Sequence, residues 1–225
     1  MVPGTNGPNR VVMILMRNVP RNQTTALLAT VAIGLFAYFV AALLLLHVLK
    51  ADYTVVDHMI SDYAVGRFGW IMTTAFTSIA IGCLLLGIGM LRQGPPSWLG
   101  RLGAVLLLVV FAGLVVTAIF PTDLETAPST PTGDIHALSF FVNIVAILLS
   151  AVSLGLSYDG DEYWRRRKGF ALGLSAFLIV AFVAQFFTLH RGAPYGLTNR
   201  AFVAIMMFWL FSTTLWLRQI AIERS

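Results

Sequence analysis

The chain has 225 residues, of which 58% are hydrophobic and only 11% are charged, and its mean hydropathy is +0.82. Because a soluble domain carries about 25% charged residues, this composition excludes an ordinary water-soluble protein and favours one embedded in lipid. The formal net charge is +5, but the basic residues lie in short segments between apolar runs. That pattern is typical of membrane topology, so we expect membrane lipids and no nucleic acid among the partners.

The apolar runs have the length that a membrane-spanning helix needs. A bilayer core of about 30 Å requires about 20 residues, because a helix rises about 1.5 Å per residue. Six segments qualify, roughly Thr25–Leu49, Gly69–Leu91, Leu102–Phe120, Ile135–Leu156, Phe170–Leu189 and Ala201–Leu217. The sequence therefore predicts an all-α membrane bundle of about six transmembrane helices over residues 23–220. Residues 1–22 are expected to be a cytoplasmic or interfacial lead-in, and residues 221–225 a cytoplasmic tail.

The distribution of basic residues predicts the orientation of this bundle. Eleven of the fifteen Lys and Arg residues lie in the N-terminal segment, the second and fourth connections and the C-terminal segment. The other side has only Lys50, Arg67, Arg191 and Arg200. Since cytoplasmic loops are enriched in Lys and Arg, we expect both termini in the cytoplasm of a multi-pass protein of the cell membrane.

Titratable residues gather on the opposite, extracytoplasmic side. All four histidines, His47, His58, His136 and His190, are expected there, together with six of the ten acids. Topology rules explain the basic residues on the cytoplasmic side, but they do not require these histidines and acids opposite. We therefore look for a functional site at the extracytoplasmic face.

The first loop contains three candidate catalytic residues, His58, Ser61 and Asp62. If this segment is helical, His58 shares a face with the other two, which follow it by three and four residues. A hydroxyl beside an imidazole is the minimum for an activated nucleophile. The alternative is structural, with Ser61 or Asp62 as the N-cap of the second helix.

His136 is the fourth candidate catalytic residue. It lies near the start of the fourth helix, with Asp134 as the expected N-cap, and Ser139 and Asn143 follow it on the same face. Polar groups inside a membrane usually face the bundle interior or a watery cavity. We expect His136 and the first loop to line one polar cavity; the alternative is a plain interfacial histidine.

Five residues near the ends of the third, fifth and sixth helices are candidates for substrate binding: Asp123, Arg191, Tyr195, Asn199 and Arg200. Arg191 or Arg200 would hold an anionic headgroup. For Arg200 the alternative is a structural salt bridge, with Asp62 or Asp123 as the expected partner. Asn199 is also a candidate N-cap of the last helix.

Histidines are common zinc ligands, so a zinc ion is the candidate cofactor, with His58, His136 and His190 as candidate ligands. A catalytic zinc site needs three such ligands. The sequence has no His-Glu-x-x-His motif, no Gly-rich phosphate loop and no Gly-x-Ser-x-Gly motif. The single cysteine, Cys83, excludes an intrachain disulfide.

Several short motifs resemble those of the uncharacterised polytopic family catalogued as domain of unknown function 998. They are Ser61-Asp62-Tyr63-Ala64-Val65-Gly66, Phe120-Pro121-Thr122-Asp123, the lone His136, and Gly196-Leu197-Thr198-Asn199-Arg200. The resemblance spans about residues 25–220 and implies a six-helix bundle with no established activity.

Two weaker likenesses point to hydrolases. The chain is similar to androgen-induced six-helix fatty-ester hydrolases, which are thought to use a threonine near the start of helix two and a histidine in helix four; Ser61 and His136 fall in comparable places. There is also a likeness to seven-helix membrane hydrolases with zinc held by histidines, weakened here by the helix count. Both are analogies at the level of the fold.

Three functions remain open from the sequence. The most concrete is a hydrolase of lipid or acyl esters at the extracytoplasmic leaflet, with Ser61 as nucleophile or with His136 and Asp62 activating water. The second is a non-catalytic membrane module, either a sensor or a partner of another envelope protein. The third, a small-molecule transporter, has less support because no charged residue lies near a helix centre.

Overall fold

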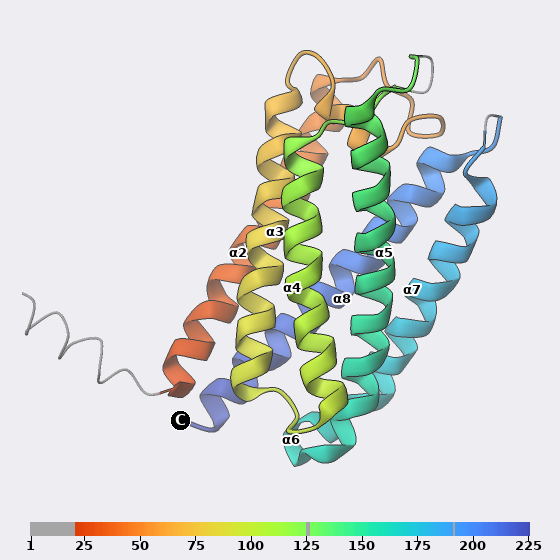
Figure 1. Ribbon diagram of the computed structural model, residues 1–225. Helices are drawn as coiled ribbons and strands as arrows, with labels where there is room; N and C mark the ends of the chain where they lie inside the picture. The colour runs from red at the N-terminus through yellow and green to blue at the C-terminus, as the bar shows by residue number, and fades with distance from the viewer. Residues whose placement is uncertain (1–20, 125–126, 191) are drawn as a thin grey trace, which may run out of the picture.

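The computed structural model describes residues 21–124, 127–190 and 192–225 (Figure 1). Residues 1–20 of the expected lead-in (residues 1–22), residues 125–126 and Arg191 lie outside the described residues. Within the described part, six helices are long and apolar enough to cross a membrane: α2 (Arg21–Leu49), α3 (Gly69–Gln93), α4 (Trp98–Ile119), α5 (Pro131–Ser157), α7 (Lys168–Thr188) and α8 (Tyr195–Glu223). The short elements are η1 (Ile60–Ala64), η2 (Tyr158–Gly160) and α6 (Glu162–Arg165). The predicted membrane bundle is confirmed.

The six helices form a ring in chain order. Each of α2, α3, α4, α5 and α7 packs against the next long helix, and α8 packs against α2 to close the ring. The helices run alternately up and down, so the connections lie at two ends (Figure 1). We call the end with the first loop, residues 50–59, the histidine end. The end with α6 and the C-terminus is the basic end.

Polar residues at the helix starts show where the sequence reading of the boundaries was wrong. The N-cap of α5 is Thr130, whose hydroxyl accepts a hydrogen bond from the Gly133 amide at 3.1 Å; Asp134 lies inside the first turn. Helix α8 begins at Tyr195, six residues before the predicted start, so Asn199 is not its N-cap. Apolar content underestimates such a helix, because its first turns are polar but packed inside the protein.

The outward-facing surface of the bundle is apolar. Large side chains such as Leu138, Phe177, Val180 and Phe187 are well exposed on the outer faces of α5 and α7. A soluble monomer rarely exposes apolar patches of this extent, whereas lipid tails solvate them well. The exposed apolar belt and the six long helices make this chain an integral membrane protein.

A polar network closes the basic end. Trp164 is fully buried, and its indole N–H donates to the Gln93 carbonyl at 3.2 Å. Arg224 donates to the same carbonyl at 3.2 Å and pairs with Asp161 at 2.5 Å, while Asn22 donates to the Arg224 carbonyl. The first and last long helices are thus tied to the fourth connection, and the cavity described next lies toward the other end.

Candidate functional site: a cavity at the histidine end

A partly enclosed cavity of about 80 Å³ lies between the helices, in the half of the bundle nearer the histidine end. It is lined from α2, η1, α3, α4, α5 and α8, and its walls are mainly apolar. These apolar residues are Phe39, Ile60, Phe76, Ile79, Cys83, Val110, Leu114, Phe140, Ile144, Ile147, Phe202, Val203, Met206 and Leu210. A water molecule needs only about 10–15 Å³ of cavity volume. The cavity therefore has room for more than one water or for part of an apolar chain.

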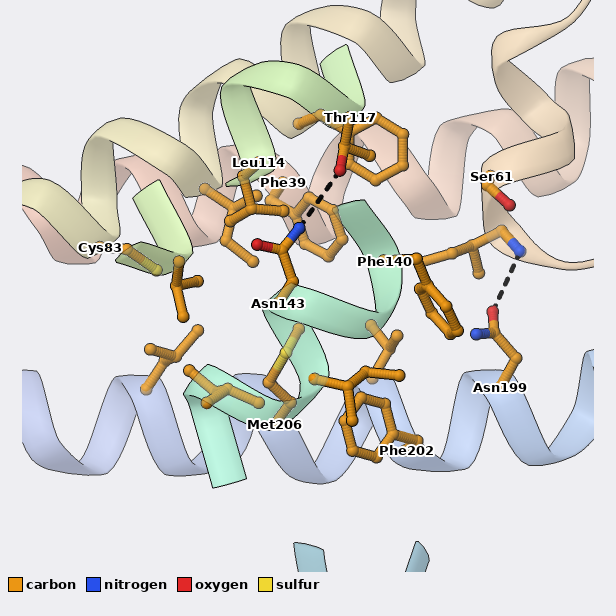
Figure 2. Close-up of a pocket in the computed structure, with 18 of the residues that line it drawn as sticks. Phe39, Ser61, Cys83, Leu114, Thr117, Phe140, Asn143, Asn199, Phe202 and Met206 are labelled. Atoms are coloured by element: carbon orange, nitrogen blue, oxygen red, sulfur yellow. Dashed lines mark hydrogen bonds between the residues drawn. The ribbon is translucent and has the colours of Figure 1, made fainter. Parts of the chain in front are cut away.

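Four of the five polar residues of the lining lie toward one end of this cavity, and we call them the polar rim. They are Ser61 of η1, Thr117 in the last turn of α4, His136 in the second turn of α5 and Asn199 in the second turn of α8. All four positions are close to the histidine end. The fifth polar residue, Asn143, lies deeper among the apolar walls (Figure 2). Figure 2 shows Ser61 and Asn199 at one edge of the pocket and Cys83 toward the opposite edge. The cavity is therefore amphipathic along its length.

His136 is a cavity residue. Its side chain is only 5% exposed, and Nδ1 lies 2.8 Å from the Phe120 carbonyl oxygen. A carbonyl oxygen can only accept, so Nδ1 must carry the proton and Nε2 of the neutral ring is an acceptor. The backbone at the end of α4 thus fixes both the tautomer and the orientation of this imidazole.

The polar stripe that follows His136 on α5 is also buried, and it packs against α4. Ser139 Oγ lies 2.9 Å from Thr117 Oγ1, and the Asn143 amide nitrogen donates to the same oxygen at 3.2 Å (Figure 2). Thr117 in turn lies in hydrogen-bonding distance of the Gly113 carbonyl, at 3.0 Å. These hydrogen bonds hold α4 to α5 and position His136 at the rim, while the buried Asn143 Oδ1 has no partner among the described residues.

Asn199 connects the rim to the first loop. Its side chain is 2% exposed, and its Oδ1 accepts the Ile60 amide proton at 3.1 Å (Figure 2). Because Oδ1 is fixed by this backbone donor, the amide nitrogen must be on the other side, where Figure 2 shows it directed toward Phe140. The interaction also places Ser61, the next residue, beside Asn199 at the cavity edge.

Arg200 does not pair with the carboxylate that the sequence suggested. Among the described residues, its hydrogen bonds go instead to neutral acceptors. Nε donates to His47 Nε2 at 2.9 Å, Nη2 donates to the Tyr63 hydroxyl at 3.0 Å, and Nη1 donates to the carbonyls of Val55, His58 and Gly196 at 3.0, 2.5 and 2.9 Å. A guanidinium with all three nitrogens engaged in this way organises the loop and is poorly placed to hold a headgroup.

The N-terminal turn of α8 holds the first loop in a second way. The Gly196 amide donates to the Val56 carbonyl at 2.8 Å, and the Tyr195 hydroxyl donates to the Asp57 carbonyl. Gly196 has no side chain, which lets the loop backbone pass directly over it. Tyr195 and Arg200 therefore act together as the attachment of this loop, above the cavity edge formed by Ile60.

Two of the candidate catalytic residues do not line the cavity. His58 stacks on Tyr53, with ring centroids 4.5 Å apart. Asp62 Oδ2 accepts the Met59 amide proton at 2.8 Å and so stabilises the start of η1. The prediction that one helical turn includes His58, Ser61 and Asp62 was wrong, because η1 begins at Ile60 and does not include His58. The structure brings together Ser61 and His136, and leaves His58 and Asp62 outside the cavity lining.

A buried cation, Lys50, lies at the start of the first loop. Lys50 donates to the Val65 carbonyl at 2.5 Å, and its ammonium lies 4.2 Å from the centre of the Tyr53 ring. Burial lowers the pKa of Lys50, while the nearby charges of Asp52 and Asp62 act in the opposite direction. Like Arg200, this basic residue of the histidine end is used to fix the loop.

Asp123 lies outside the cavity lining, and within the described part of the chain the histidines do not form a metal site. Asp123 accepts hydrogen bonds from the Thr130 amide and hydroxyl at 2.7 and 2.9 Å, so it shapes the entry to α5. Within residues 21–124, 127–190 and 192–225, no group of three or more His, Cys, Asp or Glu side chains could hold a metal ion. His58, His136 and His190 do not converge there into a joint zinc site.

The comparison with protein families matches most of the chain. The sequence model of a family described as "Protein of unknown function (DUF998)" matches residues 31–216, a range that includes every residue of the cavity lining. The chain belongs to the DUF998 family. No curated protein and no solved structure matches it. The resemblance to this family is confirmed, whereas the likeness to fatty-ester hydrolases stays a prediction.

In this DUF998 protein the apolar part of the cavity was missed by the sequence reading. Residues such as Phe140, Val203 and Met206 look like any other apolar residues of a spanning helix. One signal was available, since Asn143 and Asn199 are amides in or beside spanning segments and such polar groups tend to face the bundle interior. The apolar depth of the site depends on which faces meet, and a single sequence does not state this.

Proposed function

We propose that this protein binds a single-chain amphiphile from the membrane, with the apolar chain in the cavity and the polar head at the polar rim. The observation that carries the proposal is the amphipathic lining: the polar rim lies at the histidine end, and apart from Asn143 the walls below it are apolar. Ligand pockets typically combine such apolar walls with a few placed polar groups. With both termini in the cytoplasm, the head would lie at the level of the outer leaflet.

The arrangement of helices supports entry of such a ligand from the lipid. The cavity is lined by α5 and α8, yet these two helices make few contacts with each other, because α7 packs against both. Figure 1 shows α7 and α8 diverging from α5 toward the histidine end. An apolar chain would enter between α5 and the α7–α8 pair at that end.

Photolabelling tests this proposal. The protein would be reconstituted in vesicles with a monoacylglycerol that carries a photoreactive group on its chain. We expect saturable labelling of cavity residues such as Phe140 and Met206, removed by an excess of the unmodified lipid. Labelling of lipid-facing residues such as Phe177 serves as the background and should not saturate. If the only labelling is of this non-saturable kind, the proposal is wrong.

A second candidate function is hydrolysis of an acyl ester held at the same rim, and His136 is the observation that favours it. Its Nδ1 proton is directed to the Phe120 carbonyl, which leaves Nε2 as the acceptor that a general base requires. The base would take a proton either from the Ser61 hydroxyl or from a water molecule. The oxygen that loses this proton would bond to the acyl carbon as the ester carbon–oxygen bond breaks, and the alcohol would leave with the proton from Nε2. In the serine route a water molecule would then hydrolyse the acyl-serine ester, which releases the fatty acid and restores Ser61.

Three variants separate binding from chemistry. His136→Ala should lower ester hydrolysis by a factor of about 10² to 10⁴, the usual loss when a general base is removed. His136→Asn, whose amide can replace the Nδ1 proton toward Phe120, should restore stability without restoring hydrolysis. Ser61→Ala separates a serine route, where activity is lost, from activated water, where it is retained. Unchanged hydrolysis in His136→Asn would exclude this second function and leave amphiphile binding in place.

A further inference from the structure

Asn199 is a buried amide of the cavity lining, and only its oxygen is held by a hydrogen bond. Its Oδ1 is occupied by the Ile60 amide, and its amide nitrogen has no hydrogen bond to any of the described residues. The side chain is 2% exposed and lines the cavity. Polar groups inside native proteins nearly always have a hydrogen-bond partner, so a ligand in the cavity is the natural partner for this nitrogen.

The labelled side chains toward which this nitrogen is directed in Figure 2 are apolar. Figure 2 shows the amide nitrogen directed toward Phe140, with Phe202 on the same helix below it. Both are apolar, and Ser61 lies on the far side of the Ile60–Asn199 hydrogen bond in this view. The donor is therefore presented to the cavity, and its orientation is fixed by the backbone of η1.

We infer that Asn199 recognises the acyl carbonyl of the bound amphiphile, so that the ligand is a carbonyl-bearing lipid such as an acyl ester or a fatty acid. This inference rests on the proposed function, since it assumes that the cavity takes an amphiphile. A carbonyl oxygen accepts hydrogen bonds but cannot donate them, which matches an amide N–H donor. An acyl chain also places its carbonyl at one end of a long apolar segment, as the cavity places Asn199 at one end of its apolar walls.

A matched pair of ligands tests the inference directly. A monoacylglycerol has an ester carbonyl, and the alkylglycerol ether of the same chain length has none. Each would compete with the photoreactive monoacylglycerol for the reconstituted wild-type protein. We expect the ester to bind about tenfold more tightly than the ether, a difference of about 1.4 kcal/mol. A free fatty acid of the same length shows whether the carbonyl comes from an ester or from an acid.

Asn199→Asp is the matched variant. It keeps an acceptor oxygen for the Ile60 amide but removes both amide N–H donors, so the ester-to-ether ratio should fall to about one. Gln219→Glu makes the same amide-to-carboxylate change at an exposed position of α8 outside the cavity lining, and it should keep the wild-type ratio. Melting temperatures of both variants in detergent would report whether they fold.

The outcomes distinguish this inference from the proposed function. Tighter binding of the ester or of the fatty acid than of the ether supports the inference and identifies the ligand. Equal affinities of the wild-type protein for all three, with saturable binding intact, overturn it and leave amphiphile binding standing. The same holds if Asn199→Asp keeps the ratio. If Asn199→Asp does not fold, the ester-to-ether ratio of the wild-type protein alone still decides. Absence of saturable binding of any ligand would instead refute the proposed function.

Discussion

Arg200 illustrates how the environment of one residue determines its role. An arginine near several acids at the histidine end suggests an ion pair, but the Arg200 guanidinium donates to a histidine, a tyrosine and three backbone carbonyls. Carbonyls carry no signature in the sequence, so this partner set could not be predicted from residue types. His47 Nδ1 lies 2.7 Å from the Leu43 carbonyl, which leaves its Nε2 as the acceptor for Arg200.

We predict that Arg200→Lys destabilises the protein although it conserves the charge. Lysine has a single nitrogen and cannot reproduce the planar fork of donors, so most of the contacts to the first loop would be lost. We expect a loss of about 2–4 kcal/mol, seen as a lower melting temperature in detergent. Arg67→Lys is the control, because Arg67 is exposed at the same end and should be neutral. Equal melting temperatures for the two variants would contradict the role given to Arg200.

At the scale of elements, the first turns of α8 and the first loop form one unit. Helix α8 carries the loop attachments Tyr195 and Arg200, the glycine that lets the loop approach, and the rim residue Asn199. Apolar content predicted that a last helix exists, because its central part is lipid-compatible. It misplaced the start by six residues, because the polar side chains there are buried against the loop and not exposed to water.

Gly196→Ala tests this unit, and a second glycine provides a matched control. A Cβ at Gly196 would lie 2.8 Å from the carbonyl oxygens of Val55 and Val56, which are backbone atoms that cannot rotate away. A Cβ at Gly173, within α7, would meet nothing within 4 Å. We therefore expect Gly196→Ala to lower the melting temperature, whereas Gly173→Ala should be neutral or raise it, since alanine favours a helix over glycine by about 0.5–1 kcal/mol. The opposite order would show that the loop does not rest on α8.

On the scale of the whole molecule, the sequence predicted the elements but not their arrangement. Six apolar runs with short connections could be counted directly, and all six helices were found. The ring order and the cavity depend on which helix faces meet. Ser61 and His136 could be suggested as neighbours from their shared end of the membrane, and both line the cavity. His58 lies two residues before η1, and the residue pattern alone could not show that the helical turn begins after it.

The orientation of the bundle in the membrane is predicted only from the distribution of Lys and Arg residues between its two ends. In a Cys83→Ala background, single cysteines would replace Ser129 at the histidine end and Arg166 at the basic end, both exposed. Because cytoplasmic loops are enriched in basic residues, an impermeant thiol reagent should label intact cells at position 129. Position 166 should react only after the cells are opened. The reverse pattern would invert the proposed topology and move the polar rim to the cytoplasmic leaflet.

The central claim is that the cavity holds the apolar chain of an amphiphile, and a pair of identical substitutions tests it most directly. Val203→Phe adds bulk to the cavity wall, where Val203 is 7% exposed, while Val180→Phe adds the same bulk on the outer face of α7, where Val180 is 65% exposed. The measurement is saturable binding of the photoreactive monoacylglycerol to each reconstituted variant. We predict that Val203→Phe weakens binding at least tenfold, a change of about 1.4 kcal/mol, and that Val180→Phe binds as the wild type does. Wild-type binding by a folded Val203→Phe variant would contradict the account.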